Sequence, residues 1–163
     1  MQAHTIVILT SGLTKKAPVG ALDRAIEEFV KRKKTPFLVL GVDGDDILES
    51  CERLDDAELV FDPNDPGDSV DMFSAVKAGL YGTNAGTFVW RLDRPFPTEE
   101  VWLRLETTLR LDDEKKTDVY GCENDPSGLL LITARGNKML RERHSDNPWP
   151  VAQDIVFTTL FPT

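Results

Sequence analysis

The sequence has few of the residues that staple small proteins or build reactive centres. Its 163 residues include two histidines and two cysteines. His4 and His144 are isolated, so we assign neither to a metal, and no Ser-His-Asp or Cys-His grouping can be argued from this chain. Cys51 and Cys122 lie far apart and outside any CxxC pattern, so we expect reduced thiols, as in a cytosolic protein.

Long apolar runs and an excess of positive charge are also absent. No apolar stretch reaches about 18 residues, and the first residues lead into an apolar strand without a basic segment before it. We therefore expect no membrane span, no signal peptide and a cytoplasmic location. Lys and Arg number 19 against 28 Asp and Glu, a net charge of −9. Because an acidic surface repels phosphate backbones, we do not expect nucleic-acid binding, although Mg²⁺ can carry the phosphates of a small nucleotide to a carboxylate.

What is present is an alternation of short apolar runs and amphipathic segments within a length that fits one domain, residues 1–163. Apolar runs predict strands at Thr5–Thr10, Phe37–Leu40, Ala57–Phe61 and Thr87–Leu92, with helices between and after them. The first helix has an inner stripe that includes Phe29 and Val30 and ends in the basic run Lys31–Lys34, which suits the negative end of the helix dipole. A short helix is expected over Asp45–Leu54. Two later runs, Asp118–Cys122 and Leu129–Thr133, look like a hairpin. The pattern predicts an α/β fold with three Rossmann-like layers: a mixed, mostly parallel sheet with helices on both faces.

A carboxylate directly follows the fourth predicted strand. Ligands of open α/β sheets bind at the carboxyl ends of the strands, so we expect the loops 11–20, 62–69 and 93–97 to share one edge. Asp93 would stand at this edge, where a carboxylate can bind a divalent metal ion. The alternative is that Asp93 only caps the turn before Pro95.

Two other segments could meet a ligand at the same edge. Ser11 and Gly12, followed by Lys15 and Lys16, can cradle phosphate through backbone N–H groups and lysine charge. The spacing is neither GxxxxGK[ST] nor GxGxxG, and a solvated loop with two exposed lysines is the alternative. The helix start at 68–74 could receive polar groups of a ligand at its positive end, or its Asp and Ser residues could merely cap the helix.

Three segments in this order resemble a known family. They are Ile6–Gly12 (IVILTSG), Asp62–Leu80 (DPN … MFSAVKAGL) and Val89–Phe96 (VWRLDRPF). They resemble the MobA-like nucleotidyltransferases, which include the molybdopterin guanylyl- and cytidylyltransferases. Pro126–Ile132 and the following Met139-Leu140 are similar to the family's acceptor segment and the helix after it.

The resemblance implies a glycosyltransferase A type fold, like that of the nucleotide-diphospho-sugar transferases. It implies Mg²⁺-dependent transfer of a nucleotidyl group from an NTP to a phosphate-bearing acceptor such as molybdopterin, with release of pyrophosphate. Asp93 matches the family's metal-binding Asp, Ser11 and Gly12 match the start of its NTP loop, and Ser74 and Gly79 match the helix after its base-side loop.

The sequence also departs from the family pattern. The first loop is shorter and lacks Arg-Met-Gly, so Lys15 or Lys16 would have to supply the missing charge, and no His-Pro follows Gly128. The alternative function is therefore a catalytically impaired relative that binds a nucleotide, a pterin or a partner protein.

Overall fold

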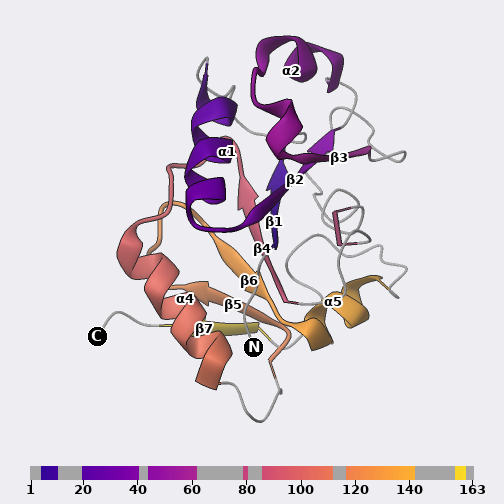
Figure 1. Ribbon diagram of the computed structural model, residues 1–163. Coiled ribbons are helices and arrows are strands. Elements are labelled where there is room, and N and C mark those ends of the chain that lie inside the picture. The colour runs from indigo at the N-terminus through magenta and orange to yellow at the C-terminus, as the bar shows by residue number, and fades with distance from the viewer. Residues whose placement is uncertain are drawn as a thin grey trace.

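The computed structural model describes residues 5–10, 20–40, 44–61, 79–80, 86–111, 117–141 and 157–160. Its strands are β1 (Thr5–Leu9), β2 (Thr35–Leu40), β3 (Glu58–Phe61), β4 (Thr87–Arg91), β5 (Val119–Cys122), β6 (Leu130–Ile132) and β7 (Phe157–Leu160). They form one sheet in the order β3-β2-β1-β4-β6-β5-β7. Only β6 runs antiparallel to its neighbours, β4 and β5, so the sheet is mixed and mostly parallel, as predicted (Figure 1).

Helices cover both faces of this sheet. In the described part of the chain they are α1 (Ala21–Lys31), α2 (Gly44–Ser50), the 3-10 helix η1 (Leu54–Asp56), α4 (Glu99–Leu111) and α5 (Ala134–Arg141). Helices α1 and α4 share one large hydrophobic cluster with one face of the sheet. A second cluster on the other face includes Leu80, from a helical segment of which residues 79 and 80 are described. The predicted three-layer α/β fold is therefore confirmed.

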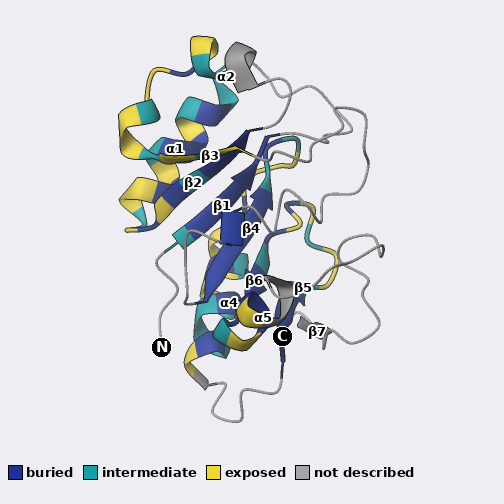
Figure 2. Cartoon of the chain, turned by 90° about the vertical axis from the view of Figure 1, so that its right-hand side faces the viewer, coloured by how far each residue is buried: buried dark blue, intermediate teal, exposed yellow. Residues whose placement is uncertain are grey.

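The side chains of the central strands alternate between the two clusters. Ile6, Ile8, Phe88 and Trp90 belong to the cluster under α1 and α4, whereas Val7, Leu9 and Val89 belong to the other. Strands β1, β2 and β4 are accordingly buried along most of their length (Figure 2). Continuous burial explains the unbroken apolar runs that predicted these strands, because both faces of a strand in a parallel sheet are covered.

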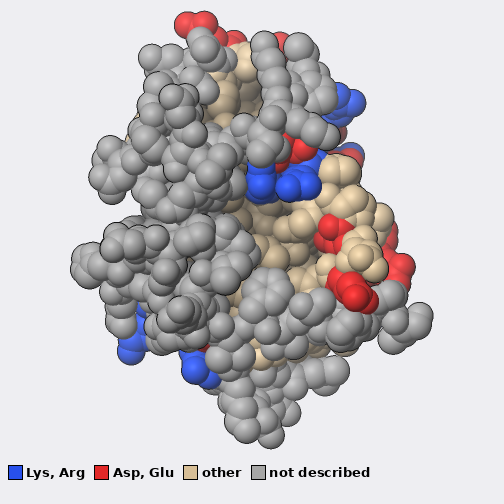
Figure 3. All heavy atoms as spheres, turned by 180° about the vertical axis from the view of Figure 1, so that it is seen from behind, with Lys and Arg blue, Asp and Glu red and all other residues tan. Residues whose placement is uncertain are grey.

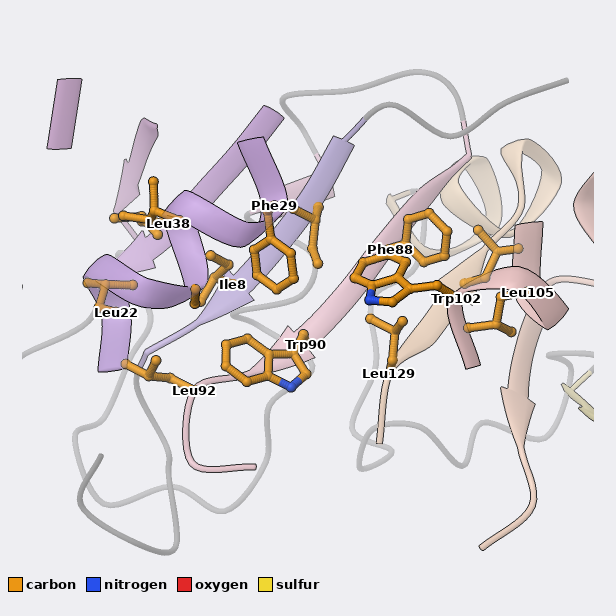
Figure 4. Close-up of a cluster of buried hydrophobic side chains, with 14 of the residues drawn as sticks. Ile8, Leu22, Phe29, Leu38, Phe88, Trp90, Leu92, Trp102, Leu105 and Leu129 are labelled. Carbon is orange, nitrogen blue, oxygen red and sulfur yellow. The ribbon is translucent and has the colours of Figure 1, made fainter. Parts of the chain in front are cut away.

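An aromatic group joins α1, α4 and the end of β4. Phe29 of α1 makes edge-to-face contacts with Trp90 and Trp102, with ring centroids 5.5 and 5.8 Å apart. The labelled side chains in Figure 4 show Phe29 pointing from α1 to the space between these two rings. Phe96 stacks on Phe29 at 5.1 Å. Such pairs prefer offset or edge-to-face geometry, and here they fix the chain segment that follows β4.

Basic residues at the turn between α1 and β2 bind to α4. Arg32 lies over the Trp102 ring, 4.9 Å from its centroid, and pairs with Glu99. The Lys34 ammonium lies 2.8 Å from a Glu106 carboxylate oxygen and 5.2 Å from the centroid of the Phe88 ring. These contacts stabilise the packing of α4 beside α1, on the face of the sheet that they share.

Two details of the predicted helices were wrong. The helix expected over 45–54 ends at Ser50, and Glu52 and Arg53 instead donate their backbone N–H groups to Oδ1 of Asp23, at 2.9 and 3.0 Å. Val30, expected on the inner side of α1, is 41% exposed. The early end of α2 shows that a contact from a distant helix, here from Asp23, overrides local periodicity. The exposure of Val30 reflects its position at the margin of the apolar stripe of α1.

Candidate functional site

Asp93 lies at the carboxyl end of β4, where the sequence placed it. Strand β4 ends at Arg91, and the Leu92 N–H still donates to the Leu9 carbonyl at 3.1 Å. The end of β4 therefore lies beside the end of β1. Thr10, the last described residue before the loop 11–19, donates its hydroxyl to the Val39 carbonyl at 2.6 Å. Asp93 thus stands next to the end of β1, with the end of β2 one strand further along the same edge. This is the edge at which open α/β sheets bind ligands.

The chain around Asp93 is held by several contacts. A turn places the Arg94 N–H 3.1 Å from the Arg91 carbonyl, and the Trp90 indole N–H donates to the Pro95 carbonyl at 3.1 Å. Leu92 is buried in the core, and Phe96 stacks on α1. These contacts fix the backbone on both sides of the carboxylate, so Asp93 sits on a rigid support rather than on a free loop.

The carboxylate of Asp93 is engaged by an arginine of the same strand. Arg91 Nε lies 3.1 Å from Asp93 Oδ1, and Arg91 Nη2 lies 2.8 Å from Oδ2. This is a bidentate, charge-assisted pair, the strongest kind of side-chain hydrogen bond. The Asp93 side chain is only 1% exposed, whereas the Arg91 side chain is 26% exposed. The guanidinium is therefore the more solvent-accessible member of the pair.

Sequence reasoning missed Arg91. The available signal was an arginine at the end of an otherwise apolar strand, two residues before the candidate carboxylate. Arg91 pairs with Leu9 in the β1–β4 register, and so starts from a fixed position at the sheet edge.

The turn between β5 and β6 reaches the same edge. Because β6 pairs antiparallel with β4, with Val89 opposite Leu130, the residues just before Leu130 lie alongside the end of β4. In this turn Asp125 accepts the Ser127 N–H at 3.0 Å and the Ser127 hydroxyl at 2.7 Å. Gly128 has φ +62°, a conformation that other residues adopt at a cost, and open space surrounds the position of a Cβ. The predicted acceptor-like segment is therefore close to Asp93 in the fold.

A second buried carboxylate belongs to the opposite edge. Asp118 is fully buried before the start of β5, and Arg135 Nε lies 3.2 Å from its Oδ1. Since β5 runs parallel to β4, the start of β5 is at the amino edge of the sheet. Within the described ranges, no three His, Cys, Asp or Glu side chains are grouped so that they could hold a metal ion. Asp118 therefore cannot complete a site around Asp93.

The other predicted site residues lie in segments that the structure does not describe. Ser11, Gly12, Lys15, Lys16 and Ser74 are all outside the described residues, as are both histidines. Gly79, which was matched to the same helix as Ser74, is described. A Cβ at Gly79 would lie 2.5 Å from Val7 Cγ1, so the missing side chain lets this helix approach β1.

On the face shown in Figure 3, Lys or Arg atoms adjoin Asp or Glu atoms at the rim of a hollow. The visible walls of the hollow are mostly uncharged residues, and further acidic atoms lie across it.

The two cysteines are free thiols, as predicted. Burial raises the pKa of Cys51 to about 11, and its hydrogen bond to Asp23 Oδ1, at 3.1 Å, adds to this shift. Burial also raises the pKa of Cys122, with a further contribution from the Asp125 charge. A thiol reacts as its thiolate, so neither cysteine is suited to act as a nucleophile.

No protein-family model and no curated protein matches this sequence. Solved structures do match over nearly its whole length. HddC from Yersinia pseudotuberculosis is 13% identical with a TM-score of 0.69, covering 97% of this chain and 90% of that one. The 4-diphosphocytidyl-2C-methyl-D-erythritol synthase from Anaerococcus prevotii is 14% identical with a TM-score of 0.59, covering 99% and 90%.

A third similar structure is a manganese complex of Rv0371c from Mycobacterium tuberculosis. It is 14% identical with a TM-score of 0.56, and the match covers 100% of this chain and 90% of that one. At these identities the likeness shows the fold, which is that of the nucleotide-diphospho-sugar transferases. None of the helices in the described ranges is long and apolar enough to cross a membrane.

Proposed function

We propose that this protein is a nucleotidyltransferase-like enzyme that transfers a nucleotidyl group from an NTP to a phosphate-bearing acceptor. The observation that carries the proposal is Asp93, a nearly buried carboxylate fixed at the carboxyl edge of β4 beside the end of β1. In this fold that edge is the place for a nucleotide. The sequence resemblance to the MobA-like family supports molybdopterin as the acceptor, in a cytoplasmic protein of molybdenum cofactor biosynthesis.

Asp93 fits a magnesium ion as a single protein ligand. Mg²⁺ keeps several waters and is usually bound by one or two carboxylates together with substrate phosphates, so one carboxylate at this edge is sufficient. The guanidinium of Arg91 must first move from its two contacts with Asp93. When bound, Mg²⁺ neutralises phosphate charge during the transfer.

The other residues have supporting roles in this proposal. Backbone N–H groups at Ser11 and Gly12, with Lys15 or Lys16, would hold the triphosphate, and the helix that contains Ser74 would approach the nucleoside. In-line attack on the α-phosphate needs positioning and charge neutralisation more than a covalent catalyst. The β5–β6 turn, at the same edge as Asp93, would face the acceptor.

Pyrophosphate release tests this proposal. The chain is incubated with each of the four NTPs, Mg²⁺ and either molybdopterin or a sugar 1-phosphate, and pyrophosphate is measured with a coupled assay. We expect turnover with one NTP and one acceptor class, and loss of turnover in EDTA. If no combination of NTP and acceptor released pyrophosphate, the proposed nucleotidyltransferase activity would be contradicted.

A second function is a non-catalytic module that binds a nucleotide, a pterin or a partner protein. The Arg91–Asp93 pair favours it, because the carboxylate is already neutralised by a protein cation. Calorimetry separates the two functions: heat of binding with an Mg²⁺-nucleotide or a pterin, without pyrophosphate release, supports the binding module. Turnover in the first assay would rule it out.

A further inference from the structure

We propose that Arg91 is a built-in competitor for the divalent cation at Asp93, so that the carboxylate is released only to a cation that arrives with a phosphate group. This inference rests on the proposed function, because it concerns the regulation of the same site. Its basis is the geometry of the pair: Arg91 Nε and Nη2 engage one Asp93 oxygen each, at 3.1 and 2.8 Å.

Exposure explains why the arginine must leave before a metal ion binds. The Asp93 side chain is 1% exposed and the Arg91 side chain 26%, so solvent reaches the guanidinium more readily than the carboxylate. A guanidinium and a divalent ion repel each other, and the carboxylate has no uncovered face toward solvent to offer both. Metal binding at Asp93 and the Arg91–Asp93 pair are therefore alternatives.

The backbone allows this exchange without a change of fold. The Leu92 N–H bond to the Leu9 carbonyl and the Arg94 N–H bond to the Arg91 carbonyl hold the main chain on both sides of the pair. Only side-chain rotations are then needed. Arg91 carries five N–H donors in a planar fork, and once released from Asp93 it can bind a phosphate oxygen pair in the same bidentate manner.

The consequence is coupling between metal and phosphate. A bare cation has to displace Arg91 with no replacement for its two hydrogen bonds, whereas a cation with a phosphate supplies a new anion for the guanidinium. By linkage, phosphate then raises the affinity for the metal and the metal raises the affinity for phosphate by the same factor.

The test is a titration of the full chain with Mn²⁺, followed by the EPR signal of the free ion. Arg91→Met removes the competitor, and Arg94→Met is the matched control, because Arg94 is an exposed arginine three residues away and its loss changes the net charge equally. We expect Arg91→Met to bind Mn²⁺ about tenfold more tightly than the parent, a change of about 1.4 kcal/mol. Arg94→Met should stay within about twofold of the parent, since its charge is largely screened.

Further variants keep the test decisive. Arg91→Lys, which retains the charge but loses the fork, should lie between the parent and Arg91→Met. Adding Asp93→Asn to Arg91→Met should remove the gain, because the metal would lose its ligand. Circular dichroism checks that each variant is folded. The proposal would be overturned if folded Arg91→Met, or folded Arg91→Lys, bound Mn²⁺ with the same affinity as the parent. It would also be overturned if Arg94→Met gained as much Mn²⁺ affinity as Arg91→Met.

Inorganic pyrophosphate is the probe for the coupling. It should raise Mn²⁺ affinity in the parent more than in Arg91→Met, after correction for Mn²⁺ bound by pyrophosphate in solution; an equal effect in both would contradict the role of Arg91. Neither measurement uses turnover. If the NTP assay shows no pyrophosphate but the Mn²⁺ titration gives the expected result, the nucleotidyltransferase proposal is rejected and the role of Arg91 as a competitor is kept. If pyrophosphate is released but the Mn²⁺ titration fails, the role of Arg91 is rejected and the nucleotidyltransferase proposal is kept.

Discussion

Replacing Gly79 by alanine measures how closely its helix approaches the sheet on the face opposite α1. The new Cβ would lie 2.5 Å from Val7 Cγ1 and 3.0 Å from Val39 Cγ2. Real Cβ atoms do not approach other atoms at the first of these distances, so the helix or the valine must shift. Val7 is fully buried and β-branched, so its side chain has little freedom to turn away.

Two opposing effects decide the result. Alanine is favoured over glycine in a helix interior by about 1 kcal/mol, which alone would stabilise the protein. Overpacking a well-filled core costs about 1–3 kcal/mol, and the clash here is with a stiff neighbour. Because the neighbour is stiff, we place the clash in the upper part of that range, at about 2–3 kcal/mol. Subtracting the helix gain of about 1 kcal/mol, we expect Gly79→Ala to lower the free energy of unfolding by about 1–2 kcal/mol.

Urea denaturation followed by circular dichroism gives this value. Val7→Ala is the partner variant, because it removes the two Val7 methyl groups that the new Cβ would meet and leaves only the contact with Val39 Cγ2. Val7→Ala alone should destabilise by creating a cavity. The double variant should be more stable than the sum of the two changes predicts, by about 1 kcal/mol or more. A stabilising Gly79→Ala, or strict additivity in the double variant, would refute the close approach.

Other predictions concern the contacts around α1 and the β5–β6 turn. Burial acts to raise the pKa of Asp23, but hydrogen bonds from Cys51 and from the Arg53 and Glu52 N–H groups outweigh it and lower the pKa below its ordinary value. The carboxylate therefore stabilises the fold above its unfolded pKa, and this contribution is lost as the pH falls through the lower folded pKa. Asp23→Asn should lose about 1 kcal/mol at pH 7 and show a flatter decline of stability below pH ~5 in urea titrations; an unchanged pH profile would contradict this role. Cys51 and Cys122 should react with Ellman's reagent at pH 8 far more slowly in the native chain than in urea, and equal rates would contradict their raised pKa values. Gly128→Ala should cost about 1 kcal/mol through backbone strain alone, because open space surrounds its Cβ, and thermal unfolding that shows no loss would exclude the positive φ.

The sequence predicted the sheet well because burial of both strand faces leaves a strong local signal. The run Thr5–Thr10 became β1 (Thr5–Leu9), and the hairpin-like pair became β5 and β6. The strand ends differ by one or two residues, which is the usual uncertainty of helix and strand boundaries.

Features that depend on distant contacts were not predictable. The helix expected to reach Leu54 stops at Ser50, and Asp23, 27 residues earlier, binds the backbone beyond it. The basic residues after α1 suited the helix dipole, but Lys34 instead lies against Glu106 and Phe88 of distant elements. Periodicity describes one element at a time, whereas these contacts exist only once the elements have packed.

The candidate site also contains one part that was predictable from the sequence and one part that was not. The position of Asp93 followed from one strand and one rule about sheet edges. Its pairing with Arg91 needed side-chain geometry, and the roles assigned to Lys15, Lys16 and Ser74 stay predictions, because these residues lie outside the described part of the chain.

The central claim is that Asp93 binds the metal of an NTP during nucleotidyl transfer. The direct test is pyrophosphate release by Asp93→Asn, compared with Asp55→Asn, which removes the same charge from an exposed residue of η1. Asparagine can still accept a hydrogen bond from Arg91, so the variant should fold. We predict that kcat/KM falls by roughly 10²–10³-fold in Asp93→Asn, the usual cost of losing one group that stabilises transition-state charge, and stays near the parent value in Asp55→Asn. Equal activity of the parent and a folded Asp93→Asn variant would contradict the account.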